Sequence, residues 1–110
     1  MTISVKTTND VKILLCEGAL DTQTSPEALS QLQQLIEEGA RKVLVNFEAL
    51  EYISSAGLHV LLTTAKQMKS VDGELRICGL NEVVKEVFDI SGFMTILKVF
   101  GAESDALEGF

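Results

Sequence analysis

The feature that most constrains the fold is a short apolar run in the middle of the chain. Residues 42–47 (KVLVNF) are almost continuously apolar. Such a run is typical of a central strand that is covered on both faces, or nearly so. A sheet with helices packed against it is therefore the expected architecture, and the segments on either side of the run agree with it.

The first 18 residues predict a β-hairpin. Ile3 and Val5 alternate with polar neighbours, as in a strand. Asn9–Asp10 then supplies a turn. Residues 11–17 (VKILLCE) predict the second strand of the hairpin, which Gly18 ends.

A polar loop and a helix are expected next. In the loop at residues 19–25, Thr24 or Ser25 is expected to cap the helix, and Pro26 suits its first turn. The residues that recur at helical spacing on the apolar face are Ala28, Leu29, Leu32, Leu35 and Ile36. Gly39 is expected to stop this helix in a left-handed conformation.

Two further helices, with a strand between them, are expected after the central run. The helix expected at residues 55–71 has one apolar face and ends at Asp72–Gly73. Residues 74–78 (ELRIC) predict the next strand. Asn81 is expected to cap a third helix, which Gly92 closes.

The end of the chain predicts a short strand at residues 95–100 and an acidic tail. We expect the tail, residues 101–110, to be loosely ordered apart from a turn around Ala106–Leu107. The element order is then ββαβαβαβ, with right-handed crossovers. The sequence thus predicts a single α/β domain over residues 1–110: a small mixed β-sheet of about five strands packed by three to four helices.

The charge of the chain argues against two classes of partner. Lys and Arg number 9 against 16 Asp and Glu, so the formal net charge is −7. This balance argues against direct nucleic-acid binding and against an anionic membrane surface.

Cys16 and Cys78 sit in apolar stretches and predict two buried thiols in a reducing compartment. The N-terminus shows no signal-peptide pattern, so we expect a cytoplasmic protein.

Most signatures of catalysis are missing. His59 is the only histidine, which excludes a multi-histidine metal site. It lies about one turn from Ser55, but the run Ile53-Ser54-Ser55-Ala56-Gly57 is no nucleophile elbow, and we expect His59 to be an exposed helix residue or a rim contact with a partner. No phosphate-binding loop is present. We therefore expect no enzyme, no cofactor and no metal.

The serine pair at the start of the second helix is the remaining candidate site. Serine at this position often caps the helix by accepting hydrogen bonds from first-turn amides. One cap suffices, however, and the small side chains of Ala56 and Gly57 leave the first turn open to another protein. A phosphate on Ser54 or Ser55 would meet free amides and the positive end of the helix dipole.

At this point the sequence resembles the STAS domain family, specifically the stand-alone bacterial anti-sigma factor antagonists. The resemblance spans about residues 2–100. Its most specific stretch is VLVNFEALEYISSAGLHVLL, and GALDTQTSPEAL and VKEVFDISGF match at the expected spacing. The resemblance implies that the unphosphorylated protein binds an anti-sigma factor, which is also a GHKL-type serine kinase, and frees the sigma factor. Phosphorylation then ends binding, and a PP2C-type phosphatase resets the switch.

Alignment on Gly57 places the family's phospho-acceptor at Ser55. The aspartate that usually precedes the acceptor falls on Ser54, so this chain lacks that carboxylate. Asp21 matches a family acid near the acceptor, although a turn or pre-helix acid is an equally good interpretation. Asn46 matches a strand-end position and is expected to be structural. The residues expected to contact the partner are Asp21, Thr22, Ser54, Ser55, Ala56, Gly57 and His59.

A second interpretation of the family resemblance remains open. STAS-like chains also serve as scaffold parts or as subunits of membrane lipid transporters. In that alternative the chain is a constitutive binding module without a phospho-switch, and Ser54 and Ser55 are cap and packing residues.

Overall fold

The computed structural model describes residues 1–110. Its sheet has six strands: β1 (Thr2–Thr8), β2 (Val11–Leu20), β3 (Lys42–Asn46), β4 (Leu50–Ile53), β5 (Glu74–Cys78) and β6 (Lys98–Phe100). Its helices are α1 (Ser25–Glu37), α2 (Ser55–Ser70), α3 (Glu82–Ser91), α4 (Phe93–Ile96) and α5 (Glu103–Leu107). The mixed α/β architecture and the expected hairpin are confirmed. None of the helices has the length and apolarity needed to cross a lipid bilayer.

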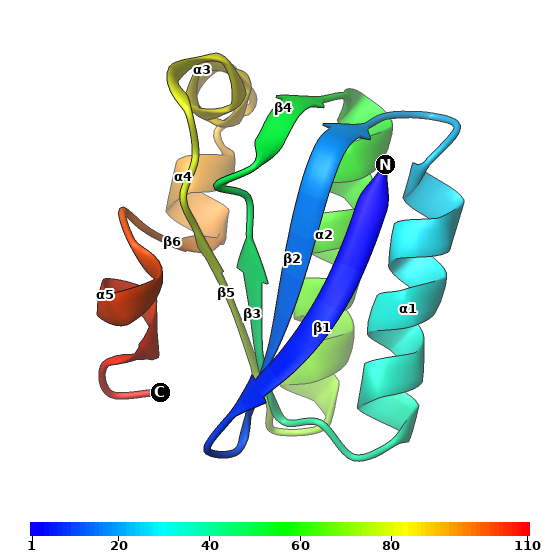
Figure 1. Cartoon of the computed structure of the whole chain (residues 1–110), viewed down its shortest axis with the longest axis vertical. Helices are drawn as coiled ribbons and strands as arrows, with labels where there is room; N and C mark the ends of the chain where they lie inside the picture. Colours follow the sequence, from blue (N-terminus) through cyan, green and yellow to red (C-terminus); the bar gives the residue numbers. More distant parts are fainter.

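The sheet order is β1-β2-β3-β5-β6, which makes β3 the central strand. β1 and β2 are antiparallel, and the remaining pairs are parallel. Helices α1 and α2 pack on one face of the sheet, and α5 lies against the other (Figure 1). Val43 and Val45 point into the larger core, whereas Leu44 points into a smaller core beneath α5. The prediction that the apolar run is covered on both faces is thus confirmed.

The C-terminal end of β2 departs from the predicted hairpin. The strand does not stop at Gly18 but continues to Leu20, with a register shift between Gly18 and Ala19. Gly18 adopts φ +96°, a left-handed conformation that suits an irregular strand position. Beyond the shift, β2 leaves β3 and pairs with β4 instead. This change of partner determines where the candidate site forms.

Two short elements were not predicted. β4 has four residues, and its burial pattern does not alternate, so the sequence LEYI carries little strand signal. α4 occupies Phe93–Ile96 and overlaps the start of the strand expected at residues 95–100, of which Lys98–Phe100 forms β6. Gly92, with φ +79°, closes α3 as predicted but also opens α4. The ring of Phe93 then packs edge-on against that of Phe88, with centroids 6.5 Å apart.

The expectation of a loosely ordered tail is wrong for the residues that carry α5. Ala106 is fully buried in the smaller core. Arg76 of β5 donates hydrogen bonds to the carbonyl oxygens of Ala106 (2.9 Å), Glu108 (2.7 Å) and Gly109 (3.1 Å). Its guanidinium also lies 4.3 Å from the centroid of the Phe110 ring. A single buried arginine, far away in sequence, therefore orders the end of the chain.

Candidate functional site

The candidate site forms where two parallel strands end side by side. Leu20, the last residue of β2, is paired with Ile53, the last residue of β4. The amide of Ser54 donates to the Leu20 carbonyl at 2.9 Å. Asp21 and Ser54, which follow these strands, are thereby held at the same edge of the sheet. The chain then turns directly into α2.

The two serines occupy different positions at this helix start. Ser54 is the N-cap: its backbone is extended, and its Oγ accepts a hydrogen bond from the Gly57 amide at 3.4 Å. The Ser54 carbonyl also accepts the first helical hydrogen bond, from Leu58, at 3.0 Å. Ser55 is the first residue of α2, and its side chain is exposed. The cap interaction therefore engages the Ser54 hydroxyl and not that of Ser55.

Gly57 is buried, and the interpretation that it opens the first turn to a partner is corrected here. A Cβ at this position would come within 2.7 Å of Ile53 Cγ1, 2.8 Å of the Leu20 carbonyl oxygen and 2.9 Å of Leu20 Cγ. The absence of a side chain thus lets the start of α2 lie directly against the ends of β2 and β4. Gly57 therefore positions the serine pair by close packing, and it does not itself offer a contact surface.

The first turn of α2 carries no acidic side chain. The amides of Ser55 and Ala56 precede the first helical hydrogen bond and have no acceptor within the helix. No side chain within this turn therefore compensates the positive end of the helix dipole. Ala56 is half-buried, and His59, one turn further along, is exposed as expected.

The side chains of Asp21, Thr24 and Ser25 together organise the loop after β2. No side-chain hydrogen bond from Thr24 caps α1. Instead, one carboxylate oxygen of Asp21 accepts from the amides of Gln23 (2.9 Å) and Thr24 (3.1 Å). The Thr24 and Ser25 hydroxyls donate to the carbonyls of Ala19 and Asp21, respectively.

The hydrogen bond from the Thr24 amide, assisted by that from Gln23, lowers the pKa of Asp21 below its usual value, although desolvation opposes the shift. Asp21 is thus a turn-forming acid that is ionised at neutral pH. It lies at the same end of the sheet as the start of α2. Thr22 in the same loop is exposed. The structure brings this loop and the serine pair together at one edge of the sheet.

Asn46 is structural, as predicted. It is buried at the end of β3, where its side-chain oxygen accepts from the Glu48 amide at 2.8 Å. Its side-chain nitrogen donates to Glu103 of α5 at 3.0 Å. Burial raises the pKa of Glu103, but the hydrogen bonds from Asn46 and Lys6 outweigh it and hold that pKa below the usual value.

The two cysteines are buried and free, as predicted. Cys16 lies in the larger core and Cys78 in the smaller one. Burial raises the pKa of Cys16 to about 12. Burial, with a smaller contribution from nearby carboxylates, raises the pKa of Cys78 to about 11. No group of three or more His, Cys, Asp or Glu side chains is arranged to hold a metal ion.

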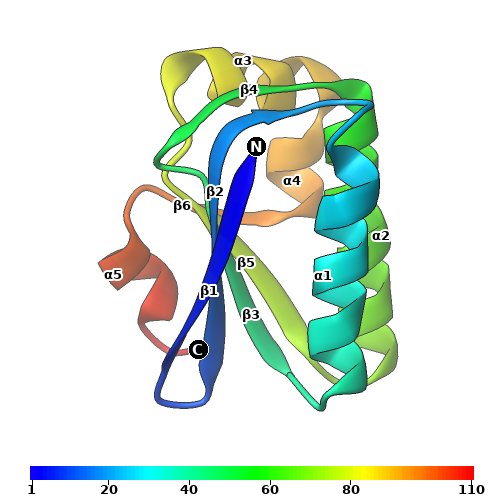
Figure 2. The ribbon, with the colours of Figure 1, turned by 45° about the vertical axis from the view of Figure 1, so that its right-hand side comes forward.

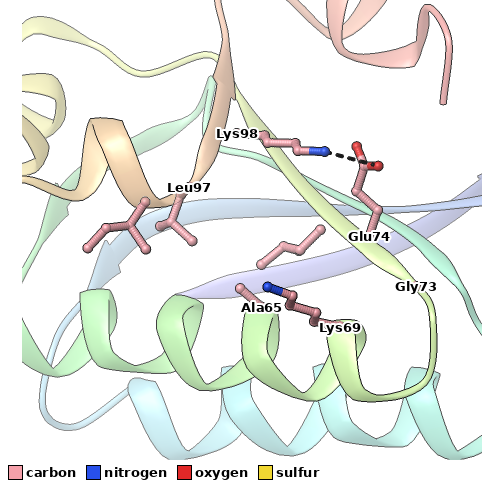
Figure 3. Close-up of a pocket in the computed structure, with 8 residues that line it drawn as sticks. Ala65, Lys69, Gly73, Glu74, Leu97 and Lys98 are labelled. Atoms are coloured by element: carbon pink, nitrogen blue, oxygen red, sulfur yellow. Dashed lines mark ion pairs between the residues drawn. The ribbon is translucent and has the colours of Figure 1, made fainter.

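A cleft of about 360 Å³ lies between α2, β5 and the α4–β6 segment (Figure 3). Ala65 and Lys69 of α2 line it, together with an ion pair between Lys98 and Glu74 at 3.3 Å. These α2 residues lie roughly 15–20 Å along the helix axis from Ser55, at about 1.5 Å per residue. The cleft is therefore separate from the serine pair.

Comparisons with known proteins agree on one family. The sequence model of the STAS domain matches residues 2–106. BtrV of Bordetella bronchiseptica, a candidate anti-sigma factor antagonist, is 37% identical over 102 residues, which cover 92% of this chain and 88% of BtrV. The anti-sigma-B factor antagonist of Staphylococcus aureus is 31% identical over 101 residues, covering 90% of this chain and 94% of that protein.

Solved structures share the fold at lower sequence identity. A candidate anti-sigma factor antagonist from Thermotoga maritima superposes with a TM-score of 0.91 at 23% identity, covering 96% of this chain and 92% of that one. The Bacillus cell fate determinant SpoIIAA, solved in its phosphorylated form, gives a TM-score of 0.74 at 20% identity, with 97% of each chain covered. These likenesses establish the arrangement of strands and helices around the serine pair.

Proposed function

The chain belongs to the STAS domain family, and we propose that it is an anti-sigma factor antagonist switched by phosphorylation of Ser55. In this proposal the unphosphorylated chain binds an anti-sigma factor that is also a GHKL-type serine kinase, and the sigma factor is released. Phosphorylation ends the binding, and a PP2C-type phosphatase restores the active form. The chain acts by binding rather than by catalysis, in the cytoplasm where sigma factors meet RNA polymerase.

The observation that carries the proposal is the different placement of the two serines. Ser54 provides the helix cap, so its hydroxyl is engaged in holding the first turn of α2. Ser55 is exposed and has no such task, so a kinase can reach its hydroxyl and modify it without removing the cap. This supports Ser55 over Ser54 as the acceptor.

A phosphate at Ser55 would change the contact surface without unfolding the domain. It adds a charge of about −1.5 to −2 at neutral pH. The free first-turn amides and the helix dipole favour a negative group at this place. A partner that fits the neutral serine, however, would have to desolvate a dianion beside the ionised Asp21 carboxylate. The predicted result is loss of the partner with the fold intact.

The neighbouring residues have distinct parts in this proposal. Thr22, Ser55 and His59 are exposed and would contact the partner directly. Asp21, Ser54 and Ala56 are half-buried and would line the edge of the contact. Gly57 is buried and would act indirectly, by seating the helix start.

Mass spectrometry tests the acceptor site. After incubation with the anti-sigma factor kinase of the same organism and ATP, the wild-type chain should gain one phosphate, about 80 Da, on the peptide that contains Ser55. Ser54→Ala should still be phosphorylated, although more slowly if the first turn frays. Ser55→Ala should gain no phosphate. Phosphorylation of Ser55→Ala to the wild-type extent would refute the assignment.

A further inference from the structure

The cleft lined by α2, β5 and the α4–β6 segment takes no part in the serine site. Its volume is about 360 Å³, near the lower end of the range of small-molecule sites in proteins, about 300–1,000 Å³. Figure 2 shows the α4–β6 segment beside α2, and Ala65 and Lys69 of α2 form the facing wall. The size of the cleft therefore suits a compact ligand.

The buried side of the cleft is apolar. Leu75 of β5 is 6% exposed, Leu97 at the end of α4 is 5% exposed, and Ala65 of α2 is half-buried. Ile96 lies at the rim and is 59% exposed, so a ligand in the cleft would remove part of its apolar surface from water. No aromatic side chain lines the cleft. These walls favour a ligand with an aliphatic part over a planar aromatic one.

Positive charge predominates at the polar side of the cleft. Lys98 of β6 pairs with Glu74 at 3.3 Å, but the same carboxylate also pairs with the buried Arg76. Lys69, on the α2 wall, has no ion-pair partner. In Figure 3 the Lys69 side chain runs along α2 toward Ala65, and Lys98 and Glu74 meet on the opposite wall. Three cations therefore accompany one carboxylate here, although the chain as a whole carries a net charge of −7.

An aliphatic carboxylate meets both requirements of the cleft. Its chain would lie against Leu75 and Leu97, where each fully buried methylene group raises the affinity about fourfold (about 0.8 kcal/mol). Its carboxylate would accept charge-assisted hydrogen bonds from the ammonium groups of Lys69 and Lys98. Because these two lysines come from opposite walls, a chain that lies between the walls can reach them with the same end.

We propose that this cleft is a binding site for a free aliphatic monocarboxylate of medium chain length. Lys69 and Lys98 bind the carboxylate, and Leu75, Ile96 and Leu97 contact the chain. The site gives the protein a second function, the binding of a small molecule. It uses none of the residues of the serine pair and its loop, so this inference and the proposed phospho-switch can each fail without the other.

The test is a titration of the isotopically labelled full chain with octanoate, followed by amide chemical shifts. The shifts should saturate with a Kd of about 1 mM or below, and the largest should fall on Lys69, Leu75 and Leu97. Butanoate, whose chain is shorter, should bind at least about tenfold more weakly. Octylamine has the same chain length and the opposite charge. The net charge of −7 attracts this cation in general, so weaker binding of octylamine than of octanoate at the cleft must arise from the local lysines.

Matched variants test the residues of the site. Lys69→Gln/Lys98→Gln should bind octanoate at least about fivefold more weakly than wild type, because the carboxylate loses both charged partners. Lys66→Gln changes an exposed lysine of α2 outside the cleft and should bind within about twofold of wild type. All three lysines are exposed, so the urea unfolding midpoints of both variants should stay close to that of wild type. Ile96→Ser leaves the lysines in place and should also weaken binding, since it removes apolar area at the rim.

Four results would each overturn the inference. The first is the absence of saturable shifts at millimolar octanoate, and the second is a set of shifts that falls outside the cleft. The third is binding of octylamine at the cleft as tight as that of octanoate. The fourth is wild-type affinity for octanoate in both Lys69→Gln/Lys98→Gln and Ile96→Ser.

Discussion

Arg76→Met tests how the end of the chain is held to the sheet. Arg76 is 9% exposed, and its guanidinium donates to three main-chain carbonyls, those of Ala106, Glu108 and Gly109. It also lies between the rings of Phe100 and Phe110, 5.2 and 4.3 Å from their centroids. Methionine retains much of the apolar stem but supplies no donor and no charge. The substitution therefore removes the polar contacts with the tail, and it also removes the ion pair between Arg76 and Glu74.

The expected loss of stability follows from these contacts. Each hydrogen bond to a charged group contributes about 1.5–3 kcal/mol, so three of them set an upper range of about 4.5–9 kcal/mol. The real loss is smaller, because the tail can detach and its carbonyls can then bind water. Removing one partner from a buried charged contact usually costs about 3–5 kcal/mol. We expect a value near the lower limit, about 3 kcal/mol, since the acceptors belong to the last residues of the chain.

Urea denaturation measures the effect. At a slope of about 2 kcal/mol per molar urea, a loss of about 3 kcal/mol lowers the midpoint by about 1.5 M. Arg76→Lys is the matched control: it keeps the charge but not the planar fork, and should lose about half as much. Hydrogen exchange at the Ala106 amide should quicken in both variants. A loss below about 1 kcal/mol for Arg76→Met would refute the conclusion that this arginine orders α5.

Three further predictions concern the packing of Gly57, the acid sensitivity of the fold and the two buried thiols. Gly57→Ala should lower the free energy of unfolding by about 1–3 kcal/mol, because the added Cβ overlaps Leu20 and Ile53, and a wild-type urea midpoint would contradict this close packing. Glu103 has a pKa below its usual 4.5, so the stability it contributes is present above pH 4.5 and is lost as the pH falls through the lower, folded-state pKa. Glu103→Gln should therefore show a shallower loss of stability between about pH 5 and about pH 3 in urea titrations, and parallel curves for the two proteins would count against the assignment. Cys16 and Cys78 should resist a thiol reagent at pH 8 in the folded protein and react on unfolding, because burial raises their pKa values to about 12 and about 11; rapid labelling of the native chain would show that they are not protected.

The parts of the fold with a strong local pattern were predictable from sequence. The central strand, the hairpin and helices α1 to α3 follow from apolar periodicity and from residues such as Gly39 and Gly92, both with positive φ. The tail was not predictable, since its order depends on Arg76, some 30 residues earlier, and on pairing that no local window contains. β4 escaped notice for a similar reason: its only strand partner is the bent end of β2.

The candidate site was likewise predictable from sequence only where it depends on a local pattern. The helix start at the serine pair follows from sequence, because small polar residues precede a periodic apolar segment. Which serine caps the helix depends on backbone geometry that only the structure supplies. The burial of Gly57 against Leu20 joins segments that lie far apart in sequence, so a glycine interpreted as an open surface is in fact a packing contact. The exposure of Val83 and Ile90 likewise depends on which face of α3 meets β4.

The central claim is that a phosphate on Ser55 ends binding while leaving the fold intact. The most direct test is calorimetric titration of the anti-sigma factor kinase with the unphosphorylated chain and with the chain phosphorylated at Ser55. The phosphorylated form should bind at least about 30-fold more weakly, a difference of about 2 kcal/mol or more. Its thermal midpoint should equal or exceed that of the unphosphorylated form, because the charge lies at a helix N-terminus. Equal affinities of the two forms for the kinase would contradict the account.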